Sequence, residues 1–428
     1  MKLWDKGFST DKKIDIFTVG NDRELDLELA KYDVLGNIAH AKMLSSIGVL
    51  TGAECDALVK ELKAIGETVN DGSFTIEDTF EDVHSKIEYL LTKKLGDAGK
   101  KIHTARSRND QVLVDVQLYS KDKLQEIKTD VKALFDLLMS LADTYKDVLL
   151  PGYTHLQIAM PSSFGMWFSA YAESLIDDMY FINAAIKVAD QNPLGSAAGY
   201  GSSFAINRTM TTELLGFETL KYNSVAAQMG RGKLEKSISF AISSVAATLS
   251  KMSMDICLYM SQNFSFIAFP DELTTGSSIM PHKKNPDVFE LIRGKCNKLQ
   301  AMPYEMTLIS NNLPSGYHRD LQLLKESLIP NFSTLKSCLE MLHYSLENVQ
   351  VNKTILEDDK YTYLFSVEAV NKLVQQGVPF RDAYKIVGKD IQEGNFNPEK
   401  EVNHTHEGSI GNLCLDEINA KMEGALKF

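Results

Sequence analysis

Hydrophobic positions recur mainly at helical spacing along this chain. Between Leu124 and Tyr145, apolar residues alternate at spacings of three and four, which is typical of a helix packed in a bundle. Residues 161–188 and 232–262 show similar helical patterns, and a fourth long helix is predicted from Asn285 onward, because Asn is a favourable N-cap. Alternating β-branched runs are nearly absent, so we predict an all-α fold with a central bundle of long helices.

The segments on either side of this bundle are shorter. Residues 1–102 contain shorter helical patterns broken by polar stretches, and residues 353–428 contain two short amphipathic segments at 367–376 and 379–391. We therefore predict three domains: a smaller helical N-terminal domain, a central long-helix domain over 103–352, and a small helical C-terminal domain.

One stretch within the bundle is almost free of charge. The segment from Ser237 to Ser250 is bounded by Lys236 and Lys251. It is shorter than the roughly 18 residues that a membrane span needs, so it predicts a buried helix. Long helices of this kind are commonly covered by other copies of the chain, and we expect the protein to form oligomers.

Composition narrows the class of protein. The 428 residues are 44 % hydrophobic and 24 % charged, as in ordinary globular proteins. The net charge of −12 argues against a nucleic-acid partner, and the start of the chain has no apolar stretch that would direct export. Five scattered cysteines without a C-x-x-C pair predict neither a disulfide framework nor a thiolate metal site, and fit a reducing compartment.

Two further patterns are too weak to predict a bound group. His404 and His406 lack a third ligand at suitable spacing. The glycines at 195, 199 and 201 lack the strand-then-helix context of a dinucleotide-binding loop. We expect no metal, no cofactor and no membrane partner.

Three polar segments interrupt the helical pattern and are dense in groups that bind or move charge. The first, HTARSRND, runs from His103 to Asp110 just before a long helix. Two arginines on a non-helical stretch can clamp a carboxylate bidentately, and the neighbouring Asn and Asp can accept hydrogen bonds from a cationic group. A capped helix start with surface charges would explain the same composition.

The second segment, GYTHLQ, runs from Gly152 to Gln157 and is predicted to form the turn between two long helices. His155 can serve there as a general acid or base, because free imidazole titrates at about pH 6.5. The alternative is a structural histidine held by hydrogen bonds.

The third segment runs from Thr274 to Lys295. Residues 276–278 read Gly-Ser-Ser and predict a flexible, hydroxyl-rich loop, which is followed by Lys283 and Lys284 and then by a helix start that favours anions. We expect this loop to fold over an anionic substrate. A surface loop before a capped helix would explain the helix start but not the glycine and serines joined to paired lysines.

These three segments, together and in this order, resemble the fumarase/aspartase superfamily of lyases. The superfamily's signature loop, G-S-S-x-M-P-x-K-x-N-P, matches residues 276–286, and HTARSRND and YTHLQ resemble the argininosuccinate lyases within it. The other matching stretches are LWDKGFS near the start, EDVHSKIE at 81–88, PLGSAAG at 193–199, YHRDLQLLKE at 317–326 and GVPFRDAYKIVGK at 377–389. The resemblance therefore covers nearly the whole chain.

What the resemblance implies is a lyase that cleaves a C–N bond of 2-(N-arginino)succinate and releases arginine and fumarate. In this pattern Ser277 is the base, which is activated when the loop closes. Lys283 and Asn285 stabilise the doubly negative aci-carboxylate intermediate. His155 donates a proton to the leaving guanidinium or binds substrate, and Glu290 orients His155.

The resemblance also implies a set of substrate-binding residues and an assembly. The expected substrate-binding residues are Arg108, Asn109, Asp110, Thr154, Asn285, Tyr317, Gln322 and Lys325. Members of the family are cytoplasmic homotetramers whose active sites are shared between subunits. Such sharing would explain why the three segments lie far apart in the chain.

Three places depart from the argininosuccinate lyase pattern. His282 stands where these enzymes usually have Gln, and it is more familiar in adenylosuccinate lyases. Residues 20–23, Gly-Asn-Asp-Arg, replace a serine-containing loop, so the N-terminal substrate contact is unassigned and Asp26 is a candidate. Leu323 and Leu324 replace an acidic pair. The alternatives are another lyase of the superfamily, such as adenylosuccinate lyase, or a non-catalytic structural protein on this fold.

Overall fold

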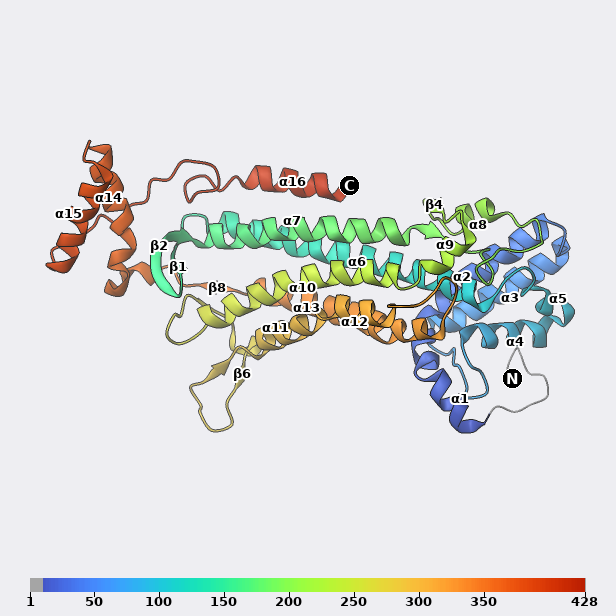
Figure 1. Cartoon of the computed structure of the whole chain (residues 1–428). Helices are drawn as coiled ribbons and strands as arrows, with labels where there is room; N and C mark the ends of the chain where they lie inside the picture. Colours follow the sequence, from blue (N-terminus) through green and yellow to red (C-terminus); the bar gives the residue numbers. More distant parts are fainter. Residues whose placement is uncertain (1–10, 428) are drawn as a thin grey trace. The chain divides into compact units, whose positions relative to one another are not determined.

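The computed structural model describes residues 11–427 of the chain, so the LWDKGFS stretch near the start lies outside the described residues. Within this range the protein is built of sixteen α-helices, a few 3-10 turns and eight short strands that pair two by two (Figure 1). The predicted all-α fold class is confirmed. No helix among these residues combines the length and the hydropathy needed to cross a membrane.

The chain divides into two compact units, and each is discontinuous in sequence. Among the described residues, unit 1 contains 11–128, 181–244 and 298–335; unit 2 contains 129–180, 245–297 and 336–427. The divisions fall within the helices α6 (Arg108–Thr144), α7 (Phe164–Ala189), α10 (Lys233–Tyr259), α11 (Asp287–Leu299) and α13 (Leu324–Leu346). The three-domain division stays a prediction.

The long helices lie where the periodicity predicts them, but their starts differ. Helix α6 begins at Arg108, so the last three residues of HTARSRND form its first turn and are not the predicted non-helical stretch. Helix α7 begins at Phe164 because residues 157–163 pair as a strand. Helix α11 begins at Asp287 and not at Asn285, because Asn285 pairs in a short strand with Thr275.

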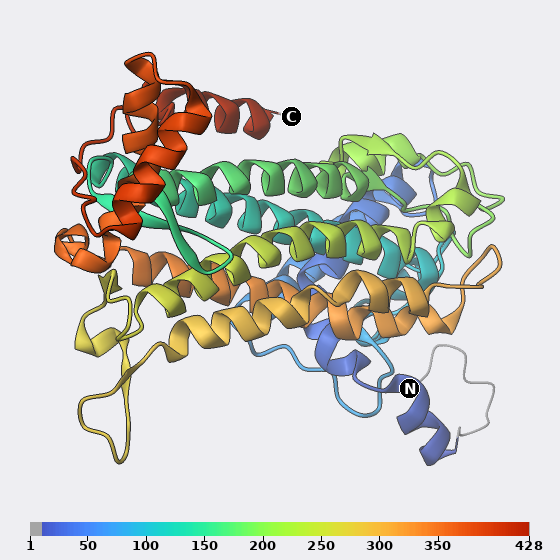
Figure 2. The ribbon, with the colours of Figure 1, turned by 60° about the vertical axis from the view of Figure 1, so that its left-hand side comes forward.

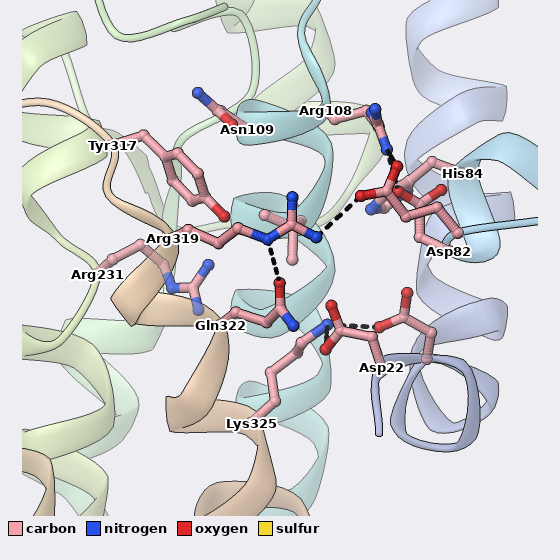
Figure 3. A pocket seen from close by; sticks show the side chains of 13 residues that line it. Asp22, Asp82, His84, Arg108, Asn109, Arg231, Tyr317, Arg319, Gln322 and Lys325 are labelled. Carbon is pink, nitrogen blue, oxygen red and sulfur yellow. Dashed lines mark hydrogen bonds and ion pairs between the residues drawn. The ribbon is translucent and has the colours of Figure 1, made fainter. Parts of the chain in front are cut away.

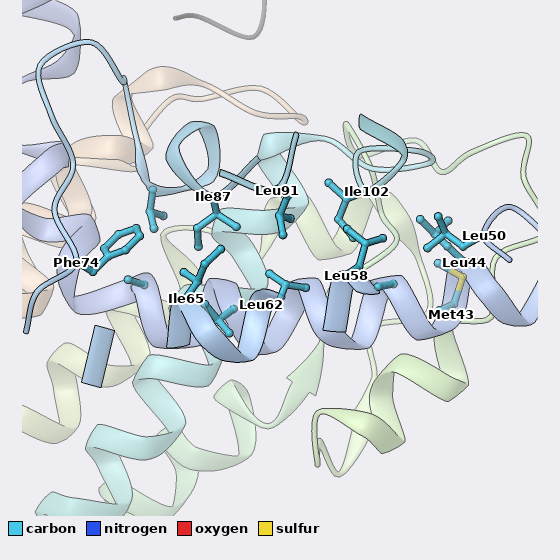
Figure 4. Packing of buried hydrophobic residues seen from close by; sticks show 14 residues of the cluster. Met43, Leu44, Leu50, Leu58, Leu62, Ile65, Phe74, Ile87, Leu91 and Ile102 are labelled. Atoms are coloured by element: carbon cyan, nitrogen blue, oxygen red, sulfur yellow. The ribbon is translucent and has the colours of Figure 1, made fainter. Parts of the chain in front are cut away.

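The N-terminal part of unit 1 packs five helices: α1 (Lys12–Val19), α2 (Asp22–Ser46), α3 (Gly52–Asn70), α4 (Val83–Leu95) and α5 (Asp97–Lys101). A capping box starts α3, where Thr51 and Glu54 bond to each other's backbone N–H groups. Apolar side chains from these helices and the loops between them form one cluster, in which Leu58, Leu62 and Leu91 have no exposed surface (Figure 4). This cluster fixes α4 against α2 and α3.

The remainder of unit 1 consists of short elements and parts of the long helices. The short elements are β3 (Gln191–Asn192), α8 (Arg208–Leu214), β4 (Thr219–Leu220), α9 (Ser224–Met229), α12 (Met302–Ile309) and the 3-10 turn η2 (Arg319–Leu323). Strands β3 and β4 are parallel.

Unit 2 contains, after the second part of α6, an antiparallel hairpin of β1 (Leu149–Thr154) and β2 (Gln157–Ser163). Its other strands pair as β5 (Ile267–Ala268) with β8 (Gln350–Val351) and as β6 (Thr275–Gly276) with β7 (Lys284–Asn285). Three 3-10 turns complete the connections: η1 (Asp271–Leu273), η3 (Ile355–Glu357) and η4 (Asp359–Phe365). The β1–β2 hairpin and the β6–β7 loop lie at the same end of this unit's long helices (Figure 2).

The C-terminal part of unit 2 contains the two predicted short helices, α14 (Ser366–Gln375) and α15 (Phe380–Gln392), and a third that the sequence reading missed. This third helix, α16 (Leu415–Lys427), buries Ile418, Met422 and Ala425. Their spacing of four and three residues is a helical signal within a tail that otherwise reads as irregular.

We predict that Leu62→Ala lowers the free energy of unfolding by about 2–5 kcal/mol, because it leaves a cavity in a fully buried cluster. Leu27→Ala on α2, where the side chain is 41 % exposed, is the control and should change it by less than about 1 kcal/mol. Urea unfolding followed by circular dichroism measures both. Equal effects of the two substitutions would contradict the assigned core.

Candidate functional site

Unit 1 contains a pocket of about 250 Å³ whose wall is made mostly of charged and polar side chains (Figure 3). Its lining residues are Asp22, Asp26, Glu81, Asp82, His84, Arg108, Asn109, Val112, Arg231, Tyr317, Arg319, Gln322 and Lys325. They come from α2, from the segment that enters α4, from the start of α6, from the turn before α10 and from the region around η2. Five of them are among the predicted substrate-binding residues.

Arg108 lies at one side of the pocket in the first turn of α6. Its Nη1 donates to Asp82 Oδ2 at 2.6 Å and to Glu81 Oε2 at 3.2 Å. Burial alone would raise the pKa of Asp82, but the charges of His84 and Arg108 hold it at about 2. Asp82 also caps α4 by accepting from the backbone N–H of Ser85. The capping carboxylate of one helix therefore positions the guanidinium at the start of another.

Arg319 and Gln322 extend the pocket wall from η2. Arg319 donates to Glu81 Oε1 at 2.9 Å and to Gln322 Oε1 at 3.2 Å. Both side chains also donate to the carbonyl of Thr18 at the end of α1. Tyr317 and Asn109 line the same pocket, and both are half-buried. The turn η2 is thus tied to the N-terminal helices.

Lys325, in the first turn of α13, is buried beside two carboxylates. Its Nζ lies 2.8 Å from Asp22 Oδ1 and 2.6 Å from Asp26 Oδ1. Burial would lower the pKa of Lys325, but Asp26 and Asp22 raise it. Burial raises the pKa of Asp22 to about 6, because the attraction of Lys325 is opposed by the neighbouring Asp26. Lys325 therefore stays charged, and Asp22 gains its proton as the pH falls through about 6.

Arg231 completes the cationic side of the pocket. It is buried, donates from Nε to Glu235 Oε1 at 2.8 Å, and donates from Nη2 to the carbonyl of Leu321 at 2.7 Å. Glu235 also accepts from the backbone N–H of Gly232, which has a φ of +79°. The hydrogen bond to Leu321 holds the turn before α10 against η2.

A fully buried triad lies against the pocket wall. Potential metal-binding atoms of Asp33, His84 and Asp115 all lie within 4.8 Å of one another. His84 Nδ1 bonds to Asp33 at 2.8 Å and lies 3.7 Å from Asp115. Burial alone would lower the pKa of His84, but the carboxylates of Asp33, Asp82 and Asp115 raise it to about 10. Among the described residues, this triad is the group that could hold a metal, but the imidazolium proton already supplies the positive charge that the carboxylates require.

Two residues of HTARSRND do not face the pocket. Arg106 is buried and donates to Asn37 Oδ1 at 2.6 Å, so the two arginines do not form the expected joint clamp. Asp110 has no exposed surface, and its carboxylate accepts from the backbone N–H groups of Ser107, Gly195 and Ala197. The contacts of Asp110 join the start of α6 to the 193–199 segment, which is a structural role within unit 1.

In unit 2, the GYTHLQ segment forms a two-residue hairpin turn and not the predicted helix-to-helix turn. Thr154 pairs with Gln157, and the two residues between them, His155 and Leu156, have φ values of 53° and 59°. Two non-glycine residues in left-handed conformation carry backbone strain. Thr154, His155 and Leu156 are exposed. The strained turn presents the imidazole at the hairpin tip.

The signature loop of unit 2 projects from the β6–β7 pair. The hydroxyl oxygen of Ser277 accepts from the backbone N–H of Met280 at 3.1 Å, and Asn285 Nδ2 donates to the Gly276 carbonyl at 3.3 Å. Lys283 is exposed, and Glu290 in α11 lies 4.0 Å from Arg293. Among the described residues, no hydrogen bond or ion pair joins Glu290 to His155, so the orienting role of Glu290 stays a prediction.

The sequence reading missed several charged residues of the pocket. These are Asp22, Glu81, Asp82, His84, Arg231 and Arg319, while Asp26 was only a candidate. The stretch EDVHSKIE contains Glu81, Asp82 and His84, and YHRDLQLLKE contains Arg319. Both stretches match the family, so these four residues could have been proposed from the sequence. Some of their partners are distant in the chain: Lys325 and Asp26 are 299 positions apart, and no local pattern can pair such residues.

Solved lyases share the fold of this chain. EDDS lyase in complex with formate matches with a TM-score of 0.77 at 20 % identity, covering 98 % of this chain and 90 % of that one. A class II fumarase from Schistosoma mansoni matches with a TM-score of 0.74 at 17 % identity, covering 96 % and 95 %. The fold class is therefore that of the fumarase-type lyases.

The chain belongs to the lyase family, whose model matches residues 7–301. An argininosuccinate lyase from Phocaeicola vulgatus is 61 % identical over 98 % of this chain and 94 % of its own length. The enzyme of the same name from Thermotoga neapolitana is 38 % identical over 91 % of this chain and 98 % of its own length.

We predict that His84→Gln destabilises the fold by about 3 kcal/mol at pH 7, because it leaves Asp33 and Asp115 without their buried counter-charge. The folded-state pKa of about 10 exceeds the unfolded value of 6.5. The proton therefore contributes fully below about pH 6.5, and its contribution is lost as pH rises through 10. The difference between wild type and variant should shrink over this range in urea unfolding.

His103→Gln is the control for this measurement. His103 is half-buried and lies 3.4 Å from Glu88, so its replacement should change stability by about 0.5 kcal/mol or less. A difference between wild type and His84→Gln that stays constant from pH 6 to pH 10 would show that His84 is not the titrating group.

Proposed function

We propose that this chain is an argininosuccinate lyase, which cleaves 2-(N-arginino)succinate to arginine and fumarate. The observation that carries the proposal is that relatives of this name match nearly the whole chain at about 60 % identity. The pocket of unit 1 supports it, because five expected substrate-binding residues, from α6 to α13, contribute to one wall.

The charge pattern of the pocket suits this substrate. Argininosuccinate carries carboxylates at both ends, together with an ammonium and a guanidinium group. A pocket that holds both signs of charge on fixed side chains can pair with each of them, and Arg108 offers the planar donor geometry that matches a carboxylate.

For the reaction, we propose that Ser277 takes the proton from the carbon beside a succinyl carboxylate. Lys283 and Asn285 stabilise the aci-carboxylate that forms. The C–N bond then breaks, its electron pair leaves with the guanidino nitrogen, His155 supplies that nitrogen with a proton, and fumarate remains. The exposed position of the signature loop supports a closing motion that brings its groups to the substrate and excludes water.

We also propose that the enzyme works as a homotetramer in the cytoplasm, with active sites built from more than one subunit. The expected proton-transfer residues all belong to unit 2, and none lines the pocket of unit 1. The five cysteines form no disulfide, which suits a reducing compartment.

The direct test is ultraviolet detection of fumarate released by the purified protein. We expect release from argininosuccinate and none from adenylosuccinate, aspartate or malate. Release from adenylosuccinate alone would favour an adenylosuccinate lyase, the alternative that His282 suggests. If none of the four substrates released fumarate, a lyase function would be contradicted.

We predict that Ser277→Ala lowers turnover of argininosuccinate by about 10²–10⁴-fold, because the general base is lost. Ser278→Ala is the matched control in the same loop and should retain most of the activity. Gel filtration and circular dichroism should be unchanged in both variants. Retained turnover in Ser277→Ala would remove Ser277 as the base.

A further inference from the structure

The ion pairs of the pocket leave one carboxylate in excess. Arg108 and Arg319 share Glu81 and Asp82, so two cations face two anions. Lys325 alone faces both Asp22 and Asp26. The Lys325 end of the pocket therefore carries a net negative charge.

The two carboxylates beside Lys325 are not equivalent. Asp26 is 1 % exposed, and its second oxygen accepts from the backbone N–H of Val83, so it belongs to the packing of α2 against α4. The Asp22 side chain is 14 % exposed in the pocket wall. Among the residues that the structure describes, Lys325 is the one cation that pairs with it. Asp22 is thus the carboxylate that can change its partner.

The surroundings of Asp22 favour a second cation. It faces Lys325 on α13, Asp26 on its own helix and Asp82 before α4; the pocket's other charged side chains are Glu81, His84, Arg108, Arg231 and Arg319. The two neighbouring carboxylates oppose its ionisation, and burial adds to this effect. A ligand with a positive group beside Asp22 would offset the repulsion from the two carboxylates and give the buried Asp22 charge a second partner.

We propose that Asp22 binds the α-ammonium group at the arginine end of the substrate, while Lys325 binds the adjacent α-carboxylate. This inference rests on the proposed function, which supplies an α-amino acid as one end of the substrate. When the zwitterion binds, the Asp22–Lys325 ion pair is replaced by two ion pairs: Asp22 with the ammonium and Lys325 with the carboxylate. Asp22 is then a specificity residue that selects a free α-amino acid end.

A carboxylic acid without the ammonium group would bind poorly. 5-Guanidinopentanoate is arginine without its α-amino group, and its carboxylate at Lys325 would lie against the ionised Asp22 without compensation. The change in this discrimination between the wild type and an Asp22 variant therefore reports on Asp22.

The experiment measures the dissociation constants of arginine and 5-guanidinopentanoate for the full chain at pH 8 by isothermal titration calorimetry. We expect the wild type to bind arginine at least about tenfold more tightly than the analogue, since a charge-assisted hydrogen bond is lost. Asp22→Asn should reduce this ratio to within about threefold. In turnover of argininosuccinate, it should raise KM more than it lowers kcat.

Glu24→Gln is the matched control, because Glu24 is exposed on the same turn of α2 and does not line the pocket. It should keep the wild-type ratio. Asp22→Ser is a second variant with a smaller side chain, and gel filtration checks the assembly of all three. A wild-type ratio near one, or the same ratio in wild type and in both Asp22 variants, would overturn the inference.

The pH dependence gives an independent readout. The pKa of Asp22 without ligand is about 6, so protonation below this pH removes the charge that holds the ammonium. The wild-type preference for arginine should fall as pH drops from 8 to 5, while that of Asp22→Asn stays flat. A flat wild-type profile would contradict the inference.

These outcomes separate the two proposals. Fumarate release from argininosuccinate by the wild type tests the proposed function, and the binding ratio tests Asp22. If fumarate is released and the ratio is insensitive to Asp22, the function stands and the role of Asp22 is wrong. If no fumarate is released, the function fails, and the ratio still decides whether Asp22 recognises an α-amino acid.

Discussion

In unit 1, the charged side chains buried in the pocket wall meet opposite charges, because removing an unpaired ion from water is too costly for a folded chain to sustain. Lys325 meets Asp22 and Asp26, Arg231 meets Glu235, and the imidazolium of His84 meets Asp33 and Asp115. The pairs of Lys325 and of His84 join helices that are distant in the sequence. The same interactions that make the pocket polar therefore also hold its walls together.

Helix ends supply much of this polar framework. Asp82 caps α4 and binds Arg108 in the first turn of α6, and Lys325 lies in the first turn of α13. A side chain near the end of a helix is placed by the rigid helix behind it, yet it can reach beyond the packed core. With this geometry, an all-α protein can form a site from side chains at helix ends, with few loops involved.

The candidate catalytic residues of unit 2 lie on a different kind of segment. His155 is at the tip of a strained hairpin, and Ser277 lies in an exposed loop between two short strands. Neither has the network of ion pairs that fixes the residues of unit 1. Catalytic groups that must approach a substrate during turnover are well placed on such exposed segments. Groups that bind the substrate benefit from a rigid pocket wall whose charges are already paired.

The sequence by itself determined the long helices and much of the candidate site, since helical periodicity and contiguous motifs are local properties that a pattern can reveal. It placed α6 and α10 closely, and it selected Arg108, Tyr317, Gln322 and Lys325, which the structure brings together in one pocket. Only the tertiary structure decided that His155 lies in a hairpin, that the Asp110 carboxylate is buried against the 193–199 segment and that Asp22 shares Lys325 with Asp26. Those outcomes depend on partners far apart in the chain, and only folding brings such partners within the few ångströms at which charges and hydrogen bonds act.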